Sequence, residues 1–225
     1  MAQASEIAYI RIREAILSGQ LAQGQKLVEE ELVKICNVSR TPVRDALKKL
    51  AFEGYIILKK NQGGWVKTWA AEEVEEVFAA RALMESHIVE IAAKKARDSD
   101  LEVLAGLVDA LDALIEQNLP LDELVPAFLT NNRKFHDKLY EMSENSRLCN
   151  LMQALSPPPV VHRTAQFFDA KRIQQSNHDH RMLLTALQAH DEGWARTLMR
   201  AHVQAAAVSY AAYISENGSN ELPKS

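Results

Sequence analysis

The stretch "NVSRTPVRDALKKLAFEGYI", residues 37–56, decides how the N-terminal part of the chain folds. Serine and threonine are preferred at helix starts and proline is tolerated in the first turn, so Ser39 or Thr41 is expected to cap a helix that contains Pro42. Apolar residues follow at helical spacing, and Gly54 is expected to end the helix. The stretch therefore predicts a short amphipathic helix directly after a tight turn.

The segments on either side complete a small domain. Apolar residues at helical spacing predict a first helix over residues 7–17 and a second over 28–37, joined by a connector with a glycine at its bend. After the quoted helix, two strands are expected over 55–60 and 65–69, joined by the short turn "NQGG". Three helices followed by a β-hairpin form a winged helix-turn-helix, which is expected to span residues 1–70.

From about residue 71 onward, every segment favours helix. The sequence therefore predicts a mainly α protein, whose second domain, residues 71–218, is an all-α antiparallel bundle of six or seven helices. Ser99 is expected to cap one of these helices, and residues 219–225 are expected to form a disordered tail. The predicted helices of the bundle span residues 70–97, 99–117, 121–143, 146–155, 160–169, 175–190 and 193–217.

The composition argues against a membrane protein. Of the 225 residues, 47% are hydrophobic and 25% are charged, which is ordinary for a globular protein. No apolar run approaches the roughly 18 residues needed to span a bilayer, and the N-terminus lacks the apolar core of a signal peptide. Cys36 and Cys149 have neither metal-binding nor redox spacing and are expected to stay reduced. The sequence thus predicts a cytoplasmic protein that does not contact a membrane.

Charge is distributed unevenly along the chain, whose formal net charge is −4. Residues 1–68 hold 11 basic and 7 acidic side chains, whereas the remainder holds 15 basic and 23 acidic side chains. Residues 1–68, called the head below, are thus basic, and the remainder, called the body, is acidic. This asymmetry suggests that the head binds an anion.

Two arginines stand one turn apart at the start of the helix in the quoted stretch. A helix fits the major groove of B-DNA with its N-terminal end at the base edges, and an arginine fork matches the O6 and N7 atoms of guanine. The alternative is an exposed pair on a solvated helix face. Hydroxyls at the helix start, lysines beside the wing and glycines at its tip are suited to the DNA backbone and minor groove. The predicted DNA-binding residues are Ser39, Arg40, Thr41, Arg44, Lys59, Lys60, Gly63 and Gly64.

One recognition helix reads only a few base pairs, which are too few to locate a site in a genome. Two heads on a symmetric dimer read an inverted repeat, so we expect a homodimer on double-stranded operator DNA. A purely architectural DNA binder is the alternative, and it predicts that no small molecule changes the affinity for DNA.

Three of the seven histidines form a candidate metal site. His180 lies about eleven residues before the turn near Asp191 and His202 about ten after it, so both stand at similar heights on paired antiparallel helices. His136 has Asn132 one turn earlier on the same helix face. Imidazole nitrogens from three helices, together with an oxygen, suit a divalent metal, with Zn²⁺ first and nickel or manganese as further candidates. The alternative is a polar cavity lined by histidines that holds no metal.

These motifs closely resemble the GntR superfamily of bacterial transcription regulators. "SRTPVRDAL" is the most specific signature, supported by "IREAILSGQL" before it and "GGWV" after it. The remainder resembles the FadR-like branch with its all-helical FCD effector domain, through "RALMESHIVEIAAKKA", "FHDKLYEMSENSRL" and "HRMLLTALQAHDEGWARTLMRAH". Two turns depart from the family pattern without threatening the fold: Gln23-Gly24 stands where Pro-Gly is common, and Cys36-Asn37 where Leu-Gly is usual.

The resemblance implies a regulator controlled by a small molecule. It assigns base contact to Arg40 and Arg44, and it implies a repressor released by a small carboxylate or a related metabolite. Many FCD domains hold a metal with one aspartate and three histidines; the three histidines named above match that pattern, but Asn132 takes the place of the aspartate. An amide oxygen is neutral, so either metal affinity falls or an anionic effector supplies the missing charge. We expect a metal that is bound more weakly than usual.

The resemblance also matches Arg81 with an arginine that FCD domains often turn toward their pocket. There a guanidinium would hold a carboxylate effector bidentately, although an ion pair with Glu85, four residues on, is an equal alternative. Residues 68–73, which join head and body, are expected to carry a population shift between two arrangements of the heads. A metal-dependent enzyme is the rival function, but no acidic residue is placed by an obvious motif as a general base, and the DNA-reading head would be unexplained. The sequence therefore predicts a regulator that is not an enzyme.

Overall fold

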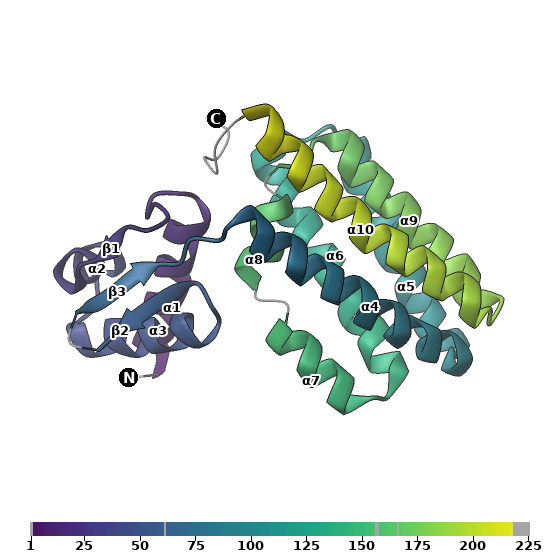
Figure 1. Cartoon of the computed structure of the whole chain (residues 1–225), viewed down its shortest axis with the longest axis horizontal. Coiled ribbons are helices and arrows are strands. Elements are labelled where there is room, and N and C mark those ends of the chain that lie inside the picture. Colours follow the sequence, from purple (N-terminus) through teal and green to yellow (C-terminus); the bar gives the residue numbers. More distant parts are fainter. Residues whose placement is uncertain (1, 61, 156–157, 166, 218–225) are drawn as a thin grey trace. The chain divides into compact units, whose positions relative to one another are not determined.

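The computed structural model describes residues 2–60, 62–155, 158–165 and 167–217 (Figure 1). The chain divides into two compact units that change over between Ala70 and Ala71, with Pro157–Arg163 grouped with the first unit. The tail expected over residues 219–225 lies outside the described residues. Among the helices described, none combines the length and the apolar character that a membrane crossing requires.

The N-terminal unit is a winged helix-turn-helix, as the sequence predicts. β3 lies between the other two strands of an antiparallel sheet, with Trp65 opposite Lys26 on one side and opposite Ile57 on the other. Asn37 ends the second helix in the left-handed conformation, with a φ of 49°, which asparagine tolerates better than most residues. The elements of this unit are α1 (Ala2–Leu17), β1 (Lys26–Leu27), α2 (Glu29–Cys36), α3 (Arg40–Phe52), β2 (Ile56–Lys59) and β3 (Gly63–Val66).

The first strand, β1, is absent from the sequence prediction, which treats residues 21–27 as a connector. Gly24 has a φ of 71° and turns the chain toward the hairpin. The backbone N–H of Gly24 donates to Val66 O, and the N–H of Val66 donates to Gln25 O, both at 3.0 Å. A strand of two residues is too short to show an alternating pattern, so only this pairing reveals that the connector belongs to the wing sheet.

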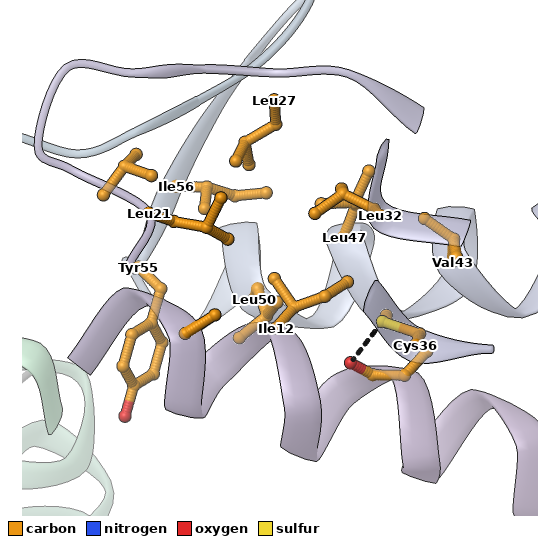
Figure 2. Packing of buried hydrophobic residues seen from close by; sticks show 14 residues of the cluster. Ile12, Leu21, Leu27, Leu32, Cys36, Val43, Leu47, Leu50, Tyr55 and Ile56 are labelled. Carbon is orange, nitrogen blue, oxygen red and sulfur yellow. Dashed lines mark hydrogen bonds between the residues drawn. The ribbon is translucent and has the colours of Figure 1, made fainter. Parts of the chain in front are cut away.

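An apolar core holds the head together (Figure 2). Side chains from the three helices and the sheet converge there, among them Ile12, Leu32 and Tyr55. Burying a leucine of this kind contributes roughly 1.5–3 kcal/mol. Cys36 lies in the same core with its Sγ 3.8 Å from Ala8 O, which gives this cysteine a packing role. The inner face of α3 is buried as the sequence predicts, at Val43, Ala46, Leu47 and Leu50.

Two helix starts differ from the sequence prediction. Ser39 precedes α3, but its side chain makes no capping hydrogen bond, and Thr41 lies inside the first turn. In the body, the residue before α5 is Arg97, so Ser99 lies within the helix and the cap predicted there is wrong. Acidic residues in the first turn of α5 interact favourably with the helix dipole and account for a start without a serine cap.

The C-terminal unit is the all-α bundle that the sequence predicts. The long helix α4 packs along α10 and also contacts α6 and α9, while α5 packs against α6 and α9 (Figure 1). This arrangement brings faces of α4, α6, α9 and α10 together around a buried polar cluster. The helices of this unit are α4 (Ala71–Lys95), α5 (Asp98–Glu116), α6 (Leu121–Ser143), α7 (Ser146–Leu155), α9 (Ala170–Gln188) and α10 (Glu192–Asn217), while α8 (Pro158–Ala165) is divided between the two units.

Helix α9 starts earlier than the sequence predicts. The expected start is Gln175, whereas the helix begins at Ala170. Asp169 caps it, because its Oδ1 accepts the backbone N–H of Arg172 at 2.7 Å. The extra turn adds Arg172 to the helix that carries His180.

Candidate functional sites

The first candidate site is the exposed start of α3. Arg40 is the first residue of the helix and Arg44 lies one turn further on, with side chains that are 63% and 61% exposed. Arg40 Nη2 lies 3.0 Å from Glu30 Oε1, and Arg44 Nε donates to both carboxylate oxygens of Glu29 at 2.9 Å. Exposed ion pairs contribute little to stability, so these acids hold the arginines only weakly. Both guanidinium groups therefore stay at the surface of the head.

Ser39 and Thr41 flank Arg40 and are also exposed. Because Ser39 is not used for capping, its hydroxyl stands at the N-terminus of a 13-residue helix. Backbone N–H groups at such a start attract phosphate oxygens. These positions suit contacts to the DNA backbone, while the arginine pair suits the bases.

The wing presents lysines beside its turn. Lys59 and Lys60 are exposed, and Lys59 Nζ lies 5.0 Å from the centre of the Trp65 ring. Gly63 is exposed at the start of β3 with a φ of 101°, a conformation that favours glycine. Gly64 is buried within the sheet, where an added Cβ would come within 3.2 Å of Leu58 Cδ2. Packing, rather than access to a groove, explains the glycine at position 64.

The second candidate site is the buried polar cluster in the bundle. The structure brings together His136 from α6, His180 from α9 and His202 from α10, and one ligand atom of each lies within 4.8 Å of the others. The centres of the His180 and His202 rings are 4.8 Å apart, and the His136 ring lies 5.6 Å and 5.4 Å from them. The ring of Phe135 stacks on His180 at 3.9 Å. Three imidazoles from three helices thus face one another.

Two carboxylates orient this cluster. His136 Nδ1 lies 2.7 Å from Glu85 Oε2, and His202 Nδ1 lies 3.2 Å from Asp179 Oδ2. The other ring nitrogen of His136 and both ring nitrogens of His180 are buried and have no hydrogen-bond partner among the described residues. A carboxylate on Nδ1 directs Nε2 of a histidine toward a metal, so the donor set fits a divalent ion such as Zn²⁺.

Electrostatics favour neutral rings at two of the three histidines. Burial lowers the pKa of His180 well below its ordinary value, and His202 and His136 lower it further. Burial also lowers the pKa of His202, although its hydrogen bond with Asp179 opposes the shift. A neutral imidazole is the form that binds a metal.

The remaining residues predicted for this site have different surroundings. Asn132 is half-buried on α6, one turn before His136. Arg81 is buried and its Nε donates to Glu85 Oε1 at 2.8 Å, which is the ion pair that the sequence offers as the alternative to effector binding. Burial alone would raise the pKa of Glu85, but Arg81 and His136 hold it well below its ordinary value.

Sequence reasoning misses three charged residues at the cluster. Glu85 is considered there only as a partner of Arg81, and Asp179 is not considered, because carboxylates that orient histidines follow no fixed spacing in the sequence. Arg172 is missed because the predicted start of its helix lies three residues further on. The capping aspartate, Asp169, is the signal that could have extended the helix.

A winged helix-turn-helix with exposed arginines, followed by a helical domain with a buried polar centre, defines a transcription regulator. The N-terminal residues 4–66 match the family model "Bacterial regulatory proteins, gntR family", and residues 76–205 match that of the FCD domain. The chain belongs to the GntR family of bacterial regulatory proteins and carries an FCD domain, as its motifs predict. It is a transcription regulator and not an enzyme.

Individual relatives agree with this assignment. The chain is 30% identical over 183 residues to the Nta operon transcriptional regulator of Aminobacter aminovorans, an alignment that covers 80% of this chain and 82% of the relative. It is 27% identical over 212 residues to the Exu regulon transcriptional regulator of Escherichia coli K12, covering 86% and 79% of the two chains. The solved structure of E. coli McbR/YncC shares the fold, with a TM-score of 0.72 at 22% identity over 95% of this chain and 100% of that one.

Proposed function

We propose that this regulator is a repressor that binds an inverted-repeat operator as a homodimer and is released by a small carboxylate metabolite. The observation that carries the proposal is the buried cluster of His136, His180 and His202. Buried polar atoms without partners cost free energy, so a bundle keeps them where a ligand compensates the loss. A purely architectural DNA binder has no need of such a centre.

In this proposal the exposed start of α3 reads the operator. Arg40 and Arg44 donate to guanine edges in the major groove, and the wing lysines neutralise phosphates. Two heads are needed because one helix specifies too few base pairs, and the symmetric dimer matches the inverted repeat.

The bundle acts as the sensor. His136, His180 and His202, with the amide oxygen of Asn132, would hold a divalent metal, Zn²⁺ before nickel or manganese. Such an ion supplies a Lewis acid to which an anionic metabolite can bind. The effector shifts the population toward an arrangement of the heads that no longer fits the operator, and residues 68–73 transmit the change.

The test uses the purified full-length protein and a labelled duplex from the DNA upstream of its own gene. We expect fluorescence anisotropy to show salt-dependent, sequence-selective binding, and light scattering to give twice the 25.2 kDa mass of the chain. Small organic acids, screened singly, are expected to reduce the affinity. A monomer in solution would contradict the dimer, and an operator affinity that no organic acid changes would favour the architectural alternative.

A further inference from the structure

The guanidinium group of Arg172 is buried and has no hydrogen-bond partner among the described residues. Its Nε, Nη1 and Nη2 atoms are each shielded from solvent, and none has a hydrogen-bond partner in the part of the chain that the structure describes. The centre of the Phe168 ring lies 5.0 Å from Arg172 Cζ. A guanidinium carries five N–H donors and stays charged, so its donors lack acceptors among the described residues, although the charges of Asp179 and Asp169 act on it through space.

The carboxylates near Arg172 are already engaged by other groups. Asp169 Oδ1 accepts the backbone N–H of Arg172 as the helix cap. Asp179 Oδ1 accepts from Gln175 Nε2 at 3.0 Å, and its Oδ2 lies 3.2 Å from His202 Nδ1. Neither carboxylate forms a hydrogen bond with the guanidinium, so the described residues offer it nearby negative charge but no acceptor oxygens.

Arg81, another buried arginine of the bundle, forms an ion pair within the protein and serves as a comparison. The guanidinium of Arg81 donates to Glu85 at 2.8 Å, and the side chains of this pair are 8% and 0% exposed. An unpaired buried charge is much more costly than a paired one. The bundle therefore supplies Arg81 with a carboxylate partner, whereas the guanidinium of Arg172 is open to an acceptor from a ligand.

Arg172 lies on the face of α9 that carries a histidine of the cluster. Arg172, Ser176 and His180 are spaced four residues apart and so line one side of the helix. Ser176 and His180 are both buried, so this side of the helix faces the interior of the bundle. A ligand held by this guanidinium would therefore lie beside the histidine cluster.

We propose that Arg172 binds the carboxylate of the effector in a bidentate pair, and that the effector is an organic acid whose carboxylate lies between this guanidinium and the three histidines. The assignment rests on the proposed sensor function of the bundle. The carboxylate supplies the two acceptor oxygens that Arg172 lacks. It also brings to the histidine cluster the negative charge that Asn132 does not provide, and Arg81 keeps a purely structural role.

The experiment measures binding of small carboxylates to the full-length protein without DNA. The probes are acetate, L-lactate, succinate and benzoate, each compared with its neutral amide by thermal shift and titration calorimetry. Each measurement is made on protein stripped with EDTA and on protein loaded with Zn²⁺. The variants are Arg172→Gln and Arg172→Lys, and Lys171→Gln removes the same charge from the adjacent exposed position.

We expect at least one carboxylate, but not its amide, to raise the unfolding midpoint of the wild-type protein. Arg172→Gln should weaken that carboxylate on the order of 10–100-fold, because a bond to a charged group is lost. Arg172→Lys should weaken it less, and Lys171→Gln should bind as the wild type does. Equal binding to Arg172→Gln, or no stabilisation of the wild type by any probe, would overturn the assignment.

A second measurement needs no ligand. Because the buried guanidinium of Arg172 has no hydrogen-bond partner among the described residues, Arg172→Met should leave the unfolding midpoint of the ligand-free protein unchanged or raise it. A clearly lower midpoint would show that the guanidinium has a partner within the protein, which would also overturn the assignment.

A measurement of operator affinity with and without the carboxylate tests the assignment of Arg172 and the proposed function separately. If a carboxylate binds through Arg172 but leaves DNA affinity unchanged, the proposed control of DNA binding fails while the assignment of Arg172 stands. If the carboxylate releases DNA equally from the wild type and from Arg172→Gln, the assignment fails while the proposed function stands.

Discussion

Arg44, one turn into α3, forms an ion pair with Glu29, the first residue of α2, with Arg44 Nε donating to both carboxylate oxygens at 2.9 Å. Glu30 lies 3.0 Å from Arg40 in the same way. The acidic start of α2 therefore neutralises the two arginines that we expect to read DNA. Because a duplex offers its own acceptors to these cations, the glutamates and the DNA compete for the same groups.

The first prediction concerns this competition. Glu29→Gln should raise the affinity for operator and for unrelated DNA alike, because it frees Arg44 and removes a negative charge from the surface that meets phosphates. The measurement is anisotropy titration with both duplexes over a range of salt concentrations. Glu31→Gln is the matched control, since Glu31 belongs to the same first turn of α2 and is exposed. Equal effects of the two variants would mean that charge alone, and not the Arg44 pair, sets the affinity.

The second prediction separates base reading from phosphate binding. Arg44→Ala should lower operator affinity on the order of 10–100-fold and relax the preference for one base, because a bidentate contact to guanine is lost. Lys59→Ala should weaken binding evenly across sequences and reduce the salt slope by about one. Titration against a panel of operators with single base changes distinguishes the two effects. An Arg44→Ala protein with unaltered selectivity would contradict base contact by this residue.

Much of the fold follows from local signals in the sequence. The predicted helices 121–143 and 146–155 coincide with α6 and α7, because Pro120 precedes the first and Glu144, with a φ of 52°, separates the two. Such boundaries are determined by residues that are neighbours in the chain. The strand β1 was missed because two residues carry no periodicity, and only its pairing with β3 defines it.

The residues of the candidate sites likewise fall into those that the sequence predicts and those that it does not. The heights of His180 and His202 above their shared turn can be calculated from helix geometry, so their meeting could be predicted. The pairing of Arg44 with Glu29 depends on the packing of two helices, and no spacing in the sequence encodes it. Arg172 is not predicted because its exposed and buried neighbours at the start of α9 show no clear apolar stripe. Only the structure shows that its guanidinium has no hydrogen-bond partner among the described residues.

The third prediction concerns metal binding by the histidine cluster. His180→Gln should lower the metal content of purified protein, measured by elemental analysis after dialysis against Zn²⁺, because His180 has two buried ring nitrogens without partners. The matched control is His178→Gln, which changes an exposed histidine two residues earlier on α9. Equal metal content in both variants would exclude the cluster as the binding site.

The fourth prediction concerns the residue that replaces the family aspartate. Asn132→Asp should tighten Zn²⁺ binding, because a carboxylate is a stronger ligand than an amide and partly neutralises the ion. Competition with a chromophoric chelator measures the affinity. Looser binding by this variant would show that position 132 is not a ligand.

The last prediction contrasts the buried ion pair of the bundle with an exposed one. Glu85→Gln should lower the free energy of unfolding of the metal-free protein by about 3–5 kcal/mol, because it leaves the Arg81 guanidinium buried without its counter-ion. Glu90, on the same helix α4, pairs at 3.0 Å with Arg196, whose side chain is 55% exposed. Glu90→Gln should therefore change the free energy of unfolding by less than about 1 kcal/mol. Urea unfolding followed by circular dichroism compares the two variants directly. Equal losses would mean that the Arg81–Glu85 pair is not isolated from solvent, and the contrast between Arg81 and Arg172 would then lose its physical basis.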